Sequence, residues 1–259
     1  MTGTVLCCTQ NNFLYLRGGI AKLVTEVHLL KIETLDLHVD LSQRPFASRD
    51  VAQFICKLNH LKTLKLEGRY HYDFYSTLSS TATTVKDNCN TSSSVTDLTV
   101  TDWTLKEWQD CGSMFDNVKR FTSQVLESIR CDVIQRIHLP AVTELTIQTH
   151  EFAREPASLH DDHTSLPNAL HKVSSQLVKV TFTDVNTGNN QTKRIIQAFR
   201  STHDLNHVNT IRFIRCGTDE SFDSCIDSND EYKINVEIVH GKPVGIDLGL
   251  EQPSGLSLA

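Results

Sequence analysis

The sequence predicts an α/β solenoid, a curved stack of similar units in which each unit adds one strand to a parallel sheet and one helix to an outer layer. Three observations predict this class. A short apolar frame recurs along the chain, helical patterns lie between its copies, and polar residues alternate with apolar ones in every expected strand. Together they place helices on one face of the sheet and water on the other.

The recurring frame is an apolar residue, a second one three positions later and a third two positions after that. In "LNHLKTLKLEG" it is filled by Leu61, Leu64 and Leu66, after a helix-like step from Leu58. Six clear copies and a weaker seventh have these central residues: Leu35, Leu64, Leu98, Phe121, Leu145, Val180 and Ile211. Intervals of about 20–35 residues suit one strand plus one return element, so about seven degenerate repeats are expected.

The segments between the frames carry helix signals. In "SRDVAQFICKL", Val51, Phe54 and Leu58 follow helical spacing behind Ser48, the expected N-cap. Similar apolar stripes occur in "LPNALHKVSSQL", with Pro167 near its start, in "QTKRIIQAFRST", and near the N-terminus from residue 20 to residue 27.

Two polar segments interrupt this rhythm. The first lies between Ser76 and Ser94, is rich in Ser and Thr, and is expected to be a long polar loop. The second is "EFAREPASLHDDHT". The expected organisation is a single domain over residues 1–240 with insertions near 69–94 and 150–165, and a flexible tail over 241–259. The aromatic residues Tyr70, Tyr72 and Tyr75 either form an exposed contact patch or pack against the next repeat.

Polarity within the strands separates two arrangements of a parallel sheet. A doubly wound sheet buries both faces and its strands are nearly continuous apolar runs, whereas here polar residues lie between the inward ones. We expect them side by side on a concave binding face: Asp36, His38, Lys65, Glu67, Thr99, Thr101, Thr146, Gln148, Thr181, Thr183 and Arg212. The alternative is a merely solvated face whose threonines reflect strand propensity.

The frames resemble the leucine-rich repeat family over Ile20–Val239. Their helical return segments are similar to the ribonuclease-inhibitor-like subtype, and within it to the repeat regions of NACHT-type (NOD-like) innate immune receptors and of F-box substrate receptors. At the position after the last strand leucine, where the family has Asn or Cys, only Cys216 is a good match.

That resemblance implies a horseshoe and a non-enzymatic protein-binding module, the ligand-sensing part of an innate immune receptor. The alternative is an F-box-type substrate-binding adaptor of a ubiquitin ligase. The expected partner is a protein or another large ligand, and the chain is expected to be part of a larger multidomain receptor.

Composition excludes several other classes. A balance of 25 Lys+Arg against 31 Asp+Glu gives a net charge of -6, which argues against a broad nucleic-acid footprint. No apolar run approaches a membrane span or a secretory signal, so a cytoplasmic protein without membrane contact is expected. Eight cysteines without a C-x-x-C pair indicate free thiols.

One cluster has the chemistry of a metal site. "LHDDHTSL" holds His160, Asp161, Asp162 and His163, all residue types that bind zinc or manganese. Adjacent residues in a loop cannot all point at one ion, so a solvated loop is the preferred interpretation. No catalytic residue, metal or cofactor is expected, and the chain is not expected to be an enzyme.

Overall fold

The structure is a computed structural model. It describes residues 4–9, 32–88, 94–101, 104, 108, 112–151, 153–159, 165–202, 207–219, 222 and 234–243. The expected N-terminal stripe at 20–27, the His160–His163 segment and most of the expected tail lie outside these residues.

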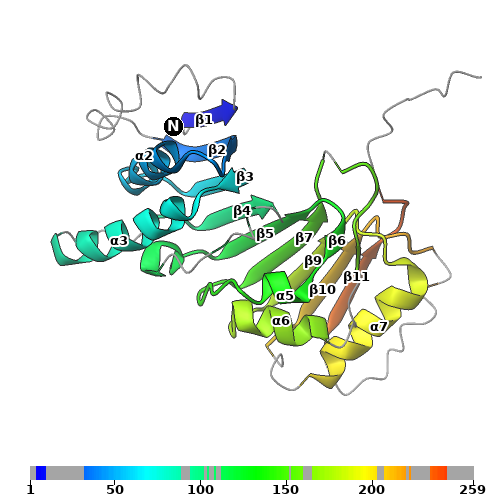
Figure 1. The fold of residues 1–259 in the computed structure, drawn as a ribbon. Helices are drawn as coiled ribbons and strands as arrows, with labels where there is room; N and C mark the ends of the chain where they lie inside the picture. Colours follow the sequence, from blue (N-terminus) through cyan, green and yellow to red (C-terminus); the bar gives the residue numbers. More distant parts are fainter. Residues whose placement is uncertain are drawn as a thin grey trace, which may run out of the picture.

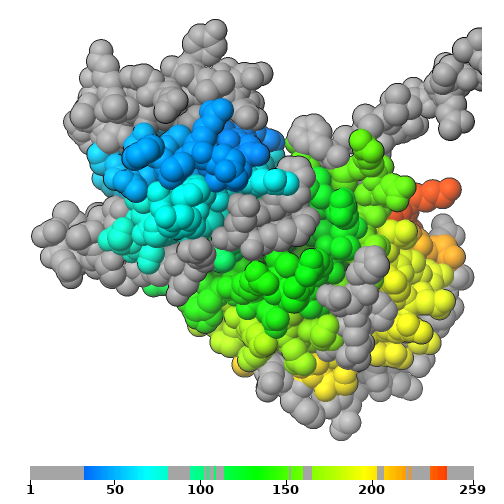
Figure 2. Space-filling view, in the orientation of Figure 1, coloured from blue at the N-terminus to red at the C-terminus, as the bar shows by residue number. Residues whose placement is uncertain are grey.

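Nine parallel strands form one sheet whose spatial order follows the chain. They are β1 (Thr4–Thr9), β2 (Ile32–Leu41), β3 (Thr63–Tyr70), β4 (Asp97–Thr101), β5 (Arg120–Val125), β7 (Glu144–Thr149), β9 (Lys179–Thr183), β10 (Thr210–Ile214) and β11 (Asn235–Val239). A second, two-stranded sheet pairs β6 (Ser128–Ile129) with β8 (Ser158–Leu159). Among the described strands, no later strand lies between two earlier ones in the main sheet. The sheet therefore grows in one direction, as Figures 1 and 2 show by the succession of colours.

The helices lie on one face of this sheet (Figure 1). They are α2 (Pro45–Cys56), α3 (Tyr72–Asn88), the 3-10 turn η2 (Gly112–Phe115), α5 (Cys131–Ile134), α6 (Ser165–Val173) and α7 (Gly188–Ser201). Helix α2 packs on α3, α5 on α6, and α6 on α7. The predicted solenoid, with a parallel sheet on the concave face and helices on the convex face, is confirmed.

The apolar frame forms the core. Its seven central residues are buried and share one register position across neighbouring strands: Leu35, Leu64, Leu98, Phe121, Leu145, Val180 and Ile211. In the second copy, Leu58 lies just after α2, Leu61 lies in the turn, and Leu64 and Leu66 point inward from β3. The change of period in "LNHLKTLKLEG" therefore marks the corner between helix and strand.

The predicted N-cap at Ser48 is wrong. Helix α2 begins at Pro45, a residue suited to the first helical turn, so Ser48 lies inside the helix and is fully buried. Its hydroxyl donates to the carbonyl of Leu41 at 3.3 Å and accepts the N–H of His71 at 3.1 Å.

The polar loop predicted between Ser76 and Ser94 is also wrong over most of its length, because α3 occupies it as far as Asn88. Phe74, Tyr75 and Leu78 supply a fully buried stripe that fixes the helix on the core despite its many Ser and Thr residues. Of the two interpretations of the tyrosines, packing holds for Tyr70 and Tyr75, whereas Tyr72 is exposed.

Buried hydroxyl groups close the corners between successive turns. Thr104 donates to the carbonyls of Leu66 and Gly68 at 3.2 and 2.9 Å. Ser174 donates to the carbonyl of Val142 at 2.8 Å, and Thr187 to that of Cys216 at 3.2 Å. Carbonyl groups that the solenoid hides from water are thereby paired, which avoids the cost of an unsatisfied buried acceptor.

The thiol of Cys216 also pairs with buried carbonyl groups. Its thiol is fully buried and lies 3.4 Å from the carbonyl of Ile214 and 3.5 Å from that of Phe182. Burial raises the pKa of this thiol to about 11, so it stays protonated and able to donate.

Gly68 allows β2 and β3 to approach closely. Its φ is +130°, and a Cβ added there would lie 2.1 Å from the carbonyl oxygen of Val39.

We expect Gly68→Ala to lower the free energy of unfolding by about 3 kcal/mol, from backbone strain plus steric overlap. Gly188→Ala is the control, because its φ is +56° with nothing within 4 Å of the added Cβ. It should cost only about 1 kcal/mol in urea denaturation; equal losses would contradict the clash.

Ser174 tests the corner hydroxyls. We expect Ser174→Ala to destabilise the fold by about 1–3 kcal/mol, because it leaves the buried carbonyl of Val142 without its donor. Ser201→Ala is the matched control, since Ser201 is exposed at the end of α7 and donates only to the carbonyl of Ala198. Its effect on the denaturation midpoint should correspond to less than about 0.5 kcal/mol. An unchanged free energy of unfolding in Ser174→Ala would show that the fold does not need this buried hydroxyl.

Candidate binding face and its charge cluster

The polar residues of the concave face form a continuous row. Strand pairing gives one register position, from β2 to β10, to Asp36, Lys65, Thr99, Thr122, Thr146, Thr181 and Arg212. The alignment expected from the sequence is therefore present, although whether the row binds a ligand stays a prediction.

Strand β5 adds two residues that sequence reasoning missed. Thr122 lies between Thr99 and Thr146, and Gln124 lies between Thr101 and Gln148. The seventh frame ends in Ser123 instead of an apolar residue, which concealed the register of this strand. The signal that could have found them is the central Phe121 immediately before Thr122.

The structure differs from the expected solvent-facing platform at three positions. Glu67, Thr101 and Thr181 are buried, whereas the other predicted residues of the face are partly exposed. Thr101 is buried because its hydroxyl accepts the N–H of Gly68 at 3.4 Å and shares a hydrogen bond with Thr104 at 3.1 Å. Thr181 lies between Thr146 and Arg212 in the row.

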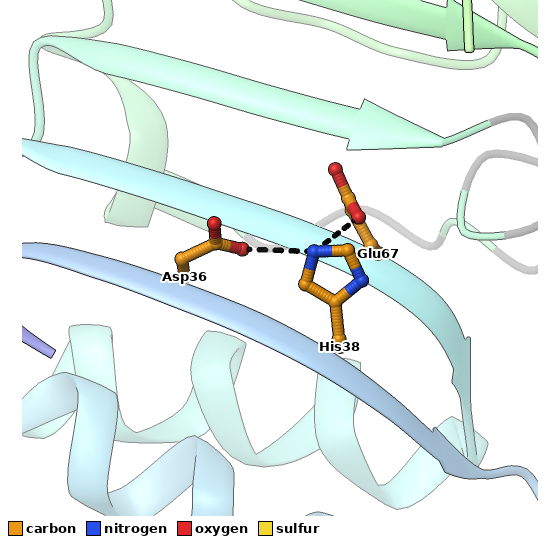
Figure 3. A group of neighbouring side chains, drawn as sticks. All are labelled: Asp36, His38 and Glu67. Carbon is orange, nitrogen blue, oxygen red and sulfur yellow. Dashed lines mark ion pairs between the residues drawn. The ribbon is translucent and has the colours of Figure 1, made fainter. Parts of the chain in front are cut away.

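Glu67 is buried because charged side chains surround its carboxylate. His38 Nε2 forms a short ion pair with Glu67 Oε2 and lies 3.5 Å from Asp36 Oδ1 (Figure 3). On the other side, Lys65 Nζ forms a short ion pair with Glu67 Oε1 and lies 3.7 Å from Asp36 Oδ2. Each carboxylate thus turns one oxygen toward Lys65 and the other toward His38.

His150 joins this group from a distant part of the chain. It follows β7 directly, is buried, and places Nε2 3.6 Å from Glu67 Oε2. We call Asp36, His38, Lys65, Glu67 and His150 the charge cluster. It brings together β2, β3 and the end of β7, which periodicity cannot predict because the contact depends on side-chain reach across intervening strands.

Burial and neighbouring charges shift the pKa of three members of the cluster, Asp36, Glu67 and Lys65. Burial raises the pKa of Asp36, and the charges of Lys65 and His38 offset only part of this. Burial also raises the pKa of Glu67, but hydrogen bonds from His150 and Lys65 outweigh it and the net pKa is lowered. For Lys65, burial lowers the pKa, and the hydrogen bond and charge of Glu67 reverse this to a net rise. Glu67 and Lys65 therefore stay charged as a pair.

One ligand atom each from Asp36, His38 and Glu67 lies within 4.8 Å of the others, a spacing that one metal ion can bridge. The metal cluster considered at His160–His163 lies outside the described residues.

In the described part of the chain, no helix is long and apolar enough to cross a membrane.

Comparison with known proteins supports the fold. No family profile matches the chain, and no curated protein matches it. Among solved structures, the leucine-rich repeat-containing protein LegL7 from Legionella pneumophila aligns with a TM-score of 0.50 at 13% identity, covering 93% of this chain and 85% of its own. A protein from Bacteroides fragilis aligns with a TM-score of 0.48 at 7% identity, covering 94% of this chain and 75% of its own.

The fold is a leucine-rich-repeat solenoid. This confirms the architecture implied by the frames. At 13% identity the likeness to LegL7 concerns the fold alone.

Substitution of Glu67 tests whether the ion pairs of the charge cluster stabilise the fold. Glu67→Gln preserves size but leaves Lys65 with only the more distant Asp36, so we expect a loss of about 2 kcal/mol in the free energy of unfolding. This is less than for a fully buried pair, because Lys65 stays partly in water. Glu33→Gln is the control: Glu33 pairs with Lys62 at 3.2 Å on the surface, with 40% and 60% of the two side chains exposed. Glu33→Gln should lower the free energy of unfolding by no more than about 0.5 kcal/mol. Similar losses in the two variants would show that Glu67 stabilises the fold no more than a surface ion pair does.

Proposed function

We propose that this chain is a non-enzymatic recognition module that binds a protein, or another large ligand, on its concave face. The observation that supports this most directly is the polar row in register across seven strands of one sheet. Parallel strands about 4.8 Å apart hold the hydroxyls of Thr99, Thr122 and Thr146 at regular intervals. A preformed surface of this kind loses little conformational entropy when it binds.

The three threonines occupy the middle of the row, between charged residues at its two ends. Lys65 and Asp36 lie toward β2, and Arg212 lies toward β11, where it pairs with Glu237 at 3.3 Å. A partner would therefore meet a hydroxyl-rich centre with a charged group on either side. We assign the binding energy to a few anchors on this row rather than to the whole area.

A finer proposal is that the chain is the ligand-sensing part of a cytoplasmic NACHT-type innate immune receptor. It rests on the sequence resemblance in frames and helical return segments. A receptor of that kind would join this solenoid to other domains, so the partner of the concave face would be the sensed protein.

A paired capture experiment tests the concave face. Thr99→Arg with Thr146→Arg should reduce capture of any direct partner at least about tenfold, because two long cations block the centre of the row. The control, Gln53→Arg with Gln197→Arg, adds the same charge to exposed positions of α2 and α7. Lys65 is left intact because it belongs to the charge cluster.

Partners are identified by crosslinking mass spectrometry against the native chain and then measured as purified proteins. Loss of binding in the concave variant with retention in the convex control supports the proposal. Equal binding by both variants, or loss only in the convex control, contradicts it.

A further inference from the structure

We propose that Asp36, His38 and Glu67 form a binding site for one divalent transition-metal ion, with zinc(II) the ion that best suits the donors. The site lies on the concave face, at the end of the polar row nearest the N-terminal strands. The inference is independent of the proposed function, since it concerns a metal ion alone.

The donor set fits this chemistry. One imidazole and two carboxylates are ligands that zinc takes from nitrogen and oxygen side chains, and in such three-ligand sites water can fill the fourth position. Asp36 and His38 come from β2 and Glu67 from β3, so the pairing of the two strands brings the ligands together. The His160–His163 segment differs, because residues adjacent in the sequence cannot all direct their side chains at one ion.

The spacing of the donor atoms also fits. One ligand atom each from Asp36, His38 and Glu67 lies within 4.8 Å of the others, and His38 Nε2 lies 3.5 Å from Asp36 Oδ1. Ligands at about 2.0–2.2 Å from a tetrahedral zinc ion are about 3.4 Å apart, close to the distance between His38 and Asp36. The contact between His38 and Glu67 is shorter (Figure 3), and it has to open by a small side-chain rotation when the ion enters.

Lys65 supports the ligands instead of competing for the same oxygens. Its ammonium lies against Asp36 Oδ2 and Glu67 Oε1. The atoms left on the other side are Asp36 Oδ1 and Glu67 Oε2, which are the ones that face His38. Outer contacts of this kind orient ligating carboxylates and strengthen metal binding.

The charge balance favours a cation at this position. Two carboxylates face one ammonium, and the Glu67 side chain is only 3% exposed. Among the described residues, no backbone N–H or hydroxyl donates a hydrogen bond to either oxygen of Glu67 or to Asp36 Oδ1. These oxygens depend on neighbouring positive charge, which a divalent ion supplies.

Zinc titration of the full chain tests the proposal. After removal of metals with a chelator, isothermal calorimetry and native mass spectrometry should show one zinc ion bound per chain. With cobalt(II) in place of zinc, the intense visible absorption of a tetrahedral site should appear. His38→Asn should weaken zinc binding at least about tenfold.

Two control variants make the result specific. His138→Asn removes an exposed imidazole outside the cluster, and His160→Asn with His163→Asn removes the run considered from the sequence. Both should keep the affinity of the native chain. Stoichiometric zinc retained in His38→Asn, zinc lost in the His160/His163 variant, or no zinc bound by the native chain each overturns the proposal.

A measurement on the native chain covers the case in which His38→Asn does not fold. Diethyl pyrocarbonate modifies accessible imidazoles, and the modified positions are mapped by mass spectrometry. Zinc should slow the modification of His38 at least about tenfold relative to His138, because a coordinated nitrogen cannot react. Equal modification of His38 with and without bound zinc contradicts the site.

Discussion

The structure depends on pairing the backbone groups that each turn of the solenoid buries under the next one. At every corner between strand and helix, carbonyl groups lose water and need a donor within the protein. Here the donors are short side chains: Ser48, Thr104, Ser174, Thr187 and the thiol of Cys216. Cys216 lies at the position where the leucine-rich repeat pattern has Asn or Cys, and Ser and Thr hydroxyls pair the buried carbonyls at the other corners named here. The strands keep their register although the intervals between the frames are irregular.

Register in turn determines the chemistry of the concave face. Because β2 and β3 pair without a shift along most of their length, Asp36 is held opposite Lys65 and His38 opposite Glu67. Four ionisable groups are therefore forced together by backbone pairing, and their charges must balance locally. His150 reaches the same carboxylate from beyond β7, so this small cluster also links strands that share no backbone hydrogen bonds.

Much of the fold was predictable because the frame is a local signal. Three apolar residues at fixed spacing identify a strand such as β9 from the sequence alone, and the polar residues between them exclude a sheet covered on both faces. The helix α3 was not predictable from composition, since its stability comes from Phe74 and Tyr75 packing on neighbouring turns and not from the Ser/Thr-rich segment itself. The burial of Glu67 was equally hidden, because alternation assigns it to the wet face and only the convergence of His38 and His150 removes it from water.

The concave face is consequently not uniform. Its centre carries hydroxyl groups that cost little to expose and can pair with many partners, whereas its N-terminal end concentrates charge around one buried carboxylate. A buried ion cluster contributes little net stability compared with apolar packing of the same volume, because desolvation offsets most of the attraction. The cluster is therefore poorly explained as a stabilising device. One ligand atom each from Asp36, His38 and Glu67 lies within 4.8 Å of the others, and Lys65 contacts the far oxygens of the two carboxylates. The face thus combines a hydroxyl-rich centre with a charged N-terminal end.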